Sequence, residues 1–146
     1  MIGLDGVCTP VLQGGRSPAE RIRLVPWGDA RVAETPPETP WPGQLPPPAP
    51  ALVHAPPLPA EVVTCDGDAV QVTGRGLSTG APARLSLDGR GWEDVVAWAG
   101  PWPVEERWWD PAARRRRARF QLLTSAGAAH LAAVEGGRWW VEATYD

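Results

Sequence analysis

Apolar and polar residues alternate most clearly in the last third of the chain. Every second residue from Ala118 to Leu122 is apolar, within a run that spans residues 117–124. Because successive side chains of a strand point to opposite faces, this period of two predicts a strand with one buried face. Comparable runs follow at 129–135 and 138–144 after glycine-containing turns. We therefore predict three consecutive antiparallel strands.

Shorter apolar runs precede these three strands. We predict further strands at 69–73, 83–87 and 94–99, separated by loops that contain glycine or proline. The run 94–99 is apolar on both faces, which predicts a central strand that ends at Gly100–Pro103. An Asp-Pro pair has the chemistry of a helix N-terminus, so a short helix is predicted over 110–115.

Composition divides the chain into three segments. Residues 1–33 form an N-terminal extension, in which the alternation at 22–25 predicts a short strand. Residues 34–60 contain eleven prolines. Since proline has no amide donor, this segment is expected to be an extended linker or strap without regular structure. Residues 61–146 are predicted to be a Trp-rich, mainly β domain, a small antiparallel sheet or partly open barrel with one short helix.

Length and charge restrict the classes of function. The 146 residues suit one domain with tails, and the net charge of −3 argues against a chain that coats nucleic acid. No apolar run reaches the roughly 18 residues of a membrane span, and the first residues lack a signal-peptide pattern. Two cysteines in dissimilar segments do not indicate a disulfide framework. We expect a cytoplasmic protein that does not act at a membrane.

Catalytic chemistry finds little support in the residue pattern. The only histidines, His54 and His130, have no Cys, Asp or His at metal-ligand spacing. The adjacent carboxylates of Glu105 and Glu106 would point to opposite sides of an extended chain, which makes them a poor acid–base pair. We predict no catalytic residue, no metal site, no cofactor and no enzymatic activity.

Nine tryptophans against one Phe and one Tyr are the most unusual feature of the composition. Their rings either build the core and hold the proline-rich segment, or form a surface for a protein partner, since Trp is enriched at interface hot spots. The segment 100–111 combines tryptophans, prolines and acidic residues. The candidate partner-binding residues in it are Trp102, Glu105, Glu106, Trp108 and Trp109.

Five arginines lie among the six residues from 114 to 119. They are candidates for contact with a phosphate backbone, with nearby Trp rings stacking on bases. Alternatively, they pair with acidic residues such as Glu105, Glu106, Asp110 and Glu135, while their stems cover apolar surface. The candidate nucleic-acid contacts are Arg114, Arg115, Arg116, Arg117 and Arg119.

The tryptophan-rich sequence from Ala97 to Pro111, AWAGPWPVEERWWDP, resembles a signature near the end of actinobacterial ImuB-like proteins. The closing sequence from Leu131 to Asp146, with its EGGRWWVE core, resembles the same region. Residues 9–29 and the Pro40–Gly43 sequence PWPG are similar to the segment that leads into this tail. The resemblance thus spans most of the chain, without the palm, fingers or complete little finger of a Y-family polymerase.

The resemblance implies a role in SOS mutagenesis. ImuB-like proteins are similar to Y-family DNA polymerases, lack the catalytic carboxylates, and serve as a hub for translesion synthesis. Their partners are an error-prone C-family polymerase, a RecA-like accessory protein and the sliding clamp. The clamp peptide is not intact here, because Gln44-Leu45-Pro46 copies only its beginning and Leu24–Gly28 only its end. We therefore expect a non-catalytic protein-interaction module, engaged at the nucleoid. The alternative is a small β-domain that binds single-stranded or damaged DNA through an Arg/Trp surface.

Overall fold

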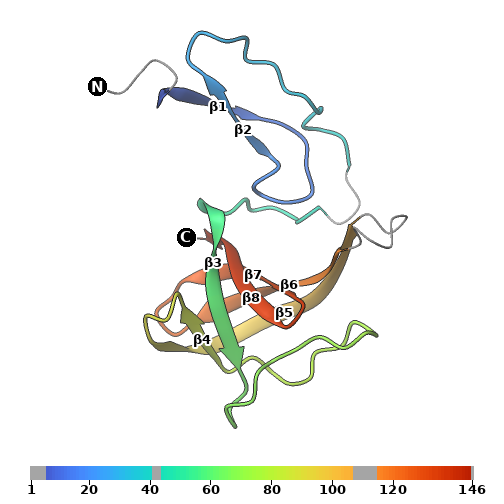
Figure 1. The fold of residues 1–146 in the computed structure, drawn as a ribbon, viewed down its shortest axis with the longest axis vertical. Coiled ribbons are helices and arrows are strands. Elements are labelled where there is room, and N and C mark those ends of the chain that lie inside the picture. The colour runs from blue at the N-terminus through green and yellow to red at the C-terminus, as the bar shows by residue number, and fades with distance from the viewer. Residues whose placement is uncertain (1–5, 41–43, 107–114, 146) are drawn as a thin grey trace. The chain divides into compact units, whose positions relative to one another are not determined.

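The computed structural model describes residues 6–40, 44–106 and 115–145, with the backbone alone for residues 105, 106 and 115. The fold is mainly β, as predicted, and the described residues contain no α-helix. The chain divides into two compact units, Met1–Ala49 and Pro50–Asp146 (Figure 1). In the described part of the chain, no helix is long and apolar enough to cross a membrane.

The first unit contains one antiparallel hairpin. Strand β1 (Cys8–Leu12) pairs with β2 (Ile22–Pro26), which includes the predicted short strand at 22–25. The connecting loop is held by the Glu20 carboxylate, which accepts hydrogen bonds from the backbone N–H groups of Arg16 and Ser17. This local capping arrangement orders a loop that contributes few apolar side chains.

The second unit is a six-stranded antiparallel barrel (Figure 1). Its strands follow one another around the barrel in chain order, and the first strand closes it by pairing with the last. The strands are β3 (Leu52–Val63), β4 (Arg84–Leu87), β5 (Trp92–Glu106), β6 (Arg115–Thr124), β7 (Ala129–Glu135) and β8 (Arg138–Tyr145).

The last three predicted strands are confirmed within a residue or two by β6, β7 and β8. Two other predictions were wrong. Residues 69–73 form no strand and make only isolated bridges at Ala69 and Val72. The predicted end at Gly100–Pro103 is instead the middle of β5, because one extra residue is absorbed as a register shift rather than ending the strand.

The expectation that residues 34–60 carry no regular structure is also corrected, since β3 begins at Leu52 and the second unit at Pro50. The prolines are tolerated for two reasons. The pairing of β3 with β8 is irregular between Val53 and Leu58, where two of the prolines lie. Pro59 lacks a donor, but its carbonyl accepts a hydrogen bond from the Asp88 N–H at 2.8 Å.

The core of the barrel is built from the inward faces of its strands. The rings of Phe120 and Trp139 lie 4.9 Å apart at its centre, with Val62, Leu85 and Val141 buried around them. Trp139 also donates its indole N–H to the Val70 carbonyl at 2.8 Å. This bond ties the loop between β3 and β4 to the core, so residues 69–72 are ordered without joining the sheet. The helix predicted for 110–115 lies outside the described residues, except for Arg115, which begins β6.

Candidate functional site

The outer surface of β5 and β6 carries a patch of exposed apolar side chains, here called the β5 face: Ala97, Ala99, Trp102 and Leu123. Ala97 lies opposite Leu123, and Ala99 opposite Gln121. Cross-strand partners share a face, and Phe120 and Leu122 point inward, so these residues point outward. The side chains of Trp102 and Leu123 are 41% and 37% exposed. The adjacent Val96, at a register shift, is 61% exposed.

Gly100 is the reason that Trp102 belongs to this face. Without an interruption, Trp102 would point to the opposite side from Ala99, because it follows three residues later. The register shift between Ala99 and Trp102 adds one residue to β5 and restores Trp102 to the outer side. Gly100 has a φ of 114°, and a Cβ there would lie 2.6 Å from the Arg119 carbonyl oxygen. Only glycine fits this bend without displacing β6.

The remaining candidate partner-binding residues are only partly placed. Glu105 and Glu106 end β5, with their backbones in register with Arg116 and Arg115. Trp108 and Trp109 lie outside the described residues. Of the predicted partner-binding set, Trp102 is therefore the residue whose side chain the structure places. Sequence analysis missed Leu123, whose position on the outer face follows from the same alternation that placed Leu122 inside.

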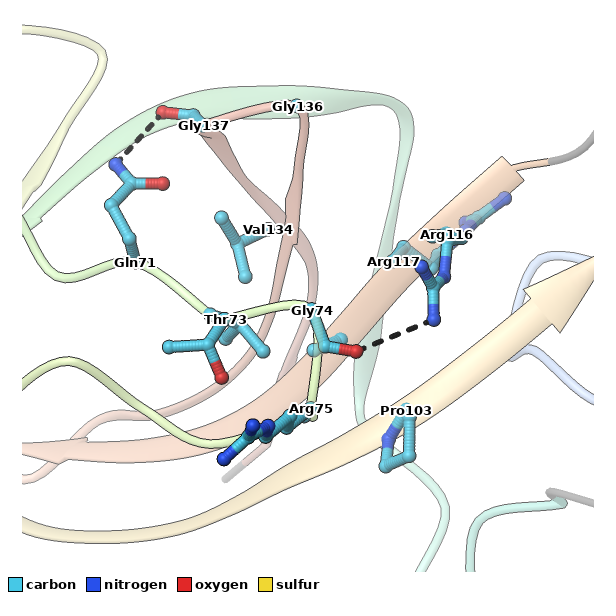
Figure 2. A pocket seen from close by; sticks show the side chains of 13 residues that line it. Gln71, Thr73, Gly74, Arg75, Pro103, Arg116, Arg117, Val134, Gly136 and Gly137 are labelled. Carbon is cyan, nitrogen blue, oxygen red and sulfur yellow. Dashed lines mark hydrogen bonds between the residues drawn. The ribbon is translucent and has the colours of Figure 1, made fainter.

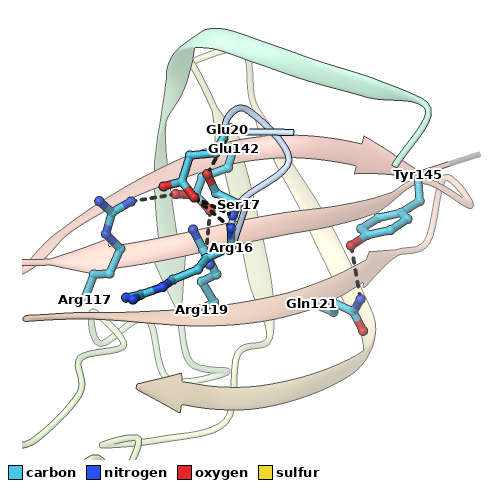
Figure 3. A network of polar contacts seen from close by, with 8 residues as sticks. All are labelled: Arg16, Ser17, Glu20, Arg117, Arg119, Gln121, Glu142 and Tyr145. Carbon is cyan, nitrogen blue, oxygen red and sulfur yellow. Dashed lines mark hydrogen bonds and ion pairs between the residues drawn. The ribbon is translucent and has the colours of Figure 1, made fainter. Parts of the chain in front are cut away.

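The arginine run does not form one basic surface. Of the five candidate nucleic-acid contacts, Arg114 lies outside the described residues and Arg115 is described by its backbone alone. Of the other three, Arg117 and Arg119 share one face of β6, and Arg116 lies on the opposite face. Figure 3 shows Arg117 and Arg119 reaching across to one carboxylate, that of Glu142 on β8. The donors Arg117 Nη1 and Arg119 Nε lie 2.9 and 2.7 Å from its oxygens.

The ion pairs of Arg117 and Arg119 with Glu142 change the interpretation of the arginine run. Arg119 is 2% exposed, so its charge belongs to the structure rather than to an accessible basic strip. The sequence analysis named other acidic partners and missed Glu142. In the sequence, Glu142 is the one charged residue in the run 139–145. It lies on β8, which is separated from the arginines of β6 by one strand, β7.

Arg116 belongs to a separate cavity of about 340 Å³ at one end of the barrel. Arg75, Arg116 and Arg117 line this cavity together with glycine turns and an apolar floor. Figure 2 shows that the arginines do not converge on a common point. Arg116 Nη2 is turned toward the Gly74 carbonyl, 3.4 Å away, while the Arg75 side chain runs in another direction. The cavity is thus rich in positive charge without a formed anion cradle.

Both histidines of the chain meet at one hydroxyl group near the opposite end of β6. His54 Nε2 lies 3.0 Å from Thr144 Oγ1, and His130 Nδ1 lies 3.1 Å from the same oxygen. The pKa of His130 lies below its ordinary value of 6.5. Burial is the main cause and the nearby His54 lowers it further, while the Glu93 carboxylate acts in the opposite direction. The sequence analysis gave these histidines no role, because their sequence separation hides their proximity.

Among the described residues, no group of three or more His, Cys, Asp or Glu side chains could hold a metal ion. Cys8 and Cys65 are both exposed free thiols. Comparison with protein-family models, with curated proteins and with solved structures finds no match to this chain.

Proposed function

We propose that this chain is a non-catalytic protein-interaction module, acting in the bacterial cytoplasm as part of a translesion DNA synthesis complex. The observation that supports the interaction role is the β5 face. It presents an indole ring at one end of an otherwise low, apolar surface formed by two alanines and a leucine.

The chemistry of this face suits a protein partner. A tryptophan offers a large contact area with only two rotatable side-chain bonds, so little entropy is lost when it is fixed at an interface. Ala97 and Ala99 leave the surface of β5 low on one side of Trp102, which gives a partner access to the ring from that side. Enclosure excludes water from an apolar anchor, and this is the usual origin of a binding hot spot.

The identity of the partner rests on the resemblance to ImuB-like proteins. It favours the RecA-like accessory protein and the error-prone C-family polymerase. The sliding clamp is not proposed, because Gln44-Leu45-Pro46 continues into prolines rather than into the rest of the clamp peptide. The module would then recruit its partners through side-chain packing, with no chemical step of its own.

The test is to replace Trp102 with alanine and measure binding to the purified accessory protein and polymerase by calorimetry. The matched control is Trp92→Ala, because Trp92 is also on β5 and is 46% exposed, but stacks on Arg84 away from the β5 face. We expect Trp102→Ala to weaken binding by about 2 kcal/mol, or roughly 30-fold, and Trp92→Ala to leave it unchanged. Equal binding by both variants and the unmodified chain would contradict the proposal.

The second candidate function is binding of single-stranded DNA, which the arginine cavity favours. Backbone binding predicts an affinity that falls steeply with salt, and a slope that decreases when one phosphate contact is removed. The comparison is between Arg116→Gln, in the cavity, and Arg90→Gln, on an exposed turn elsewhere. A submicromolar affinity at physiological salt that only Arg116→Gln weakens would place this function first.

A further inference from the structure

We propose that His54, Thr144 and His130 form a proton-sensitive clasp, which holds the N-terminal end of β3 on the barrel at neutral pH and releases it in acid. The inference does not rest on the proposed partner binding. It rests on the convergence of both histidines on one hydroxyl, from three strands that meet where the barrel closes.

The position of the clasp matters because β3 is weakly attached there. Leu52 and Val53 pair with Thr144 and Ala143 on β8, and regular pairing resumes only at Leu58. The first two residues of β3 are therefore separated from the main ladder by an irregular stretch. His54, the next residue, extends this short attachment through Thr144. Because so few backbone contacts hold this end, its local opening should cost much less than global unfolding.

On the other side of the clasp, the barrel is firmly built. His130 is in register with Thr144 on β8 and with Leu122 on β6, and its side chain is 5% exposed. The hydroxyl of Thr144 thus connects the weakly attached end of β3 to a buried part of β7. Opening of the clasp would release the β3 end while β6, β7 and β8 keep their pairing.

Counting hydrogens shows that double protonation costs the clasp one hydrogen bond. A threonine hydroxyl donates one hydrogen and accepts others. With both rings neutral, one ring can donate to Thr144 Oγ1 while the hydroxyl donates to the other ring. When one ring is protonated, that ring donates to Thr144 Oγ1 and the hydroxyl donates to the neutral ring. When both rings are cations, both facing nitrogens carry hydrogen. The hydroxyl oxygen can accept from both, but its own hydrogen then has no ring nitrogen to which it can be donated.

Charge acts in the same direction. Through the shared oxygen, the two ring nitrogens are no more than about 6 Å apart, so two cations at this site repel each other. Around His130, β5 contributes the Glu93 carboxylate and β3 contributes His54. β8 contributes the uncharged Thr144, and β6 the apolar Leu122. Glu93 moderates the repulsion, but it does not cancel the effect of burial, because the pKa of His130 is still lowered.

The sign of the pH effect follows from this lowered pKa. Released or unfolded chain binds a proton at His130 more readily than the closed form does. The clasp is therefore fully effective above about pH 6.5 and weakens as the pH falls below it. For each unit by which the pKa is lowered, the population of the released form rises by about tenfold in acid.

The first measurement is an NMR titration of the two imidazole rings in the full chain. In the unmodified protein we expect His130 to titrate below 6.5. His54→Gln removes the second cation and keeps a side chain that can donate and accept a hydrogen bond. The pKa of His130 should then rise. An unchanged pKa would show that the two rings are not coupled, and would overturn the proposal.

The second measurement is amide hydrogen exchange at pH 7.5 and 5.5, corrected for the intrinsic effect of pH on exchange. Protection of residues 52–54 should fall by about tenfold or more in acid, whereas protection of residues 120–122 in β6 should not change. In His54→Gln and Thr144→Val, the protection of residues 52–54 should no longer depend on pH. Loss of protection throughout the barrel would contradict a local clasp, and so would unchanged protection at residues 52–54.

Discussion

Two tryptophans of the barrel lie in opposite environments: Trp139 is in its core and Trp102 is on the β5 face. Trp139 is 5% exposed, packs on Phe120 and donates its indole N–H to the Val70 carbonyl. Trp102 lies on the outer side of β5, with 41% of its surface exposed. Trp139 buries its apolar area and pairs its indole N–H within the fold, while Trp102 leaves a large part of its surface open to solvent. Residue type alone therefore does not indicate whether a tryptophan stabilises the domain or serves a partner.

The strongest test of this comparison is Trp139→Ala. Removal of a buried aromatic side chain loses its transfer free energy and leaves a cavity, so we expect the free energy of unfolding to fall by about 3–5 kcal/mol. Urea denaturation measures this difference directly. Trp139→Phe is the informative companion, since it retains a ring and leaves the Val70 carbonyl without its donor; its loss should be smaller, about 1–3 kcal/mol. A loss below about 1 kcal/mol for Trp139→Ala would place this residue outside the stabilising core.

The next effect in size is expected from Gly100→Ala, at the bend that places Trp102. The new methyl group would meet the Arg119 carbonyl oxygen at 2.6 Å in a backbone conformation that disfavours side chains. We expect a loss of about 1–3 kcal/mol in unfolding free energy, with weaker partner binding because Trp102 is displaced. Gly127→Ala is the control. Its φ of 89° is also positive, but its Cβ would meet no atom within 4 Å, so it measures the backbone strain alone.

The smallest effect on stability should come from Trp102→Ala itself. Because 41% of its surface is exposed, truncation removes less buried area than at Trp139, and we expect the unfolding free energy to fall by less than about 1 kcal/mol. The same denaturation experiment checks this value beside Trp139→Ala. A change comparable to that of Trp139→Ala would show that Trp102 stabilises the barrel, and the comparison between the two tryptophans would fail.

Much of the barrel was predictable from local pattern. The alternation at 117–124 identified β6 and placed Phe120 on the buried face, and glycine turns marked β7 and β8. The errors have a common origin in long-range pairing. Residues 52–60 were predicted to lie outside the sheet because of their prolines. They nevertheless pair with β8, because the pairing is irregular where Pro56 and Pro57, which have no N–H to donate, are found. Residues 69–73 alternate as a strand should, but they make only isolated bridges, from Ala69 to Val63 and from Val72 to Ser78.

The candidate sites were predictable to a smaller degree. Trp102 was identified as a partner-binding residue, and the structure places its side chain on an exposed face; binding itself stays a prediction. The arginine run was treated as a basic edge or as a set of local ion pairs. Its described members instead divide between a shared carboxylate on β8 and a cavity lined by a distant loop. The histidines had no visible role in the sequence, because 76 positions separate two residues that share one hydroxyl.

The sequence by itself determined which residues of β6 face inward, because along a regular strand that depends only on the alternation of neighbouring side chains. It also determined where the chain turns, through glycine. The tertiary structure alone decided which strands lie side by side and in what register. That choice returned Trp102 to the outer face at Gly100, brought Glu142 to two arginines, and joined His54 to His130 through Thr144. The first two depend on the pairing of β5 to β8 with their neighbours, and the contact of His54 with Thr144 depends on the β3–β8 pair that closes the barrel.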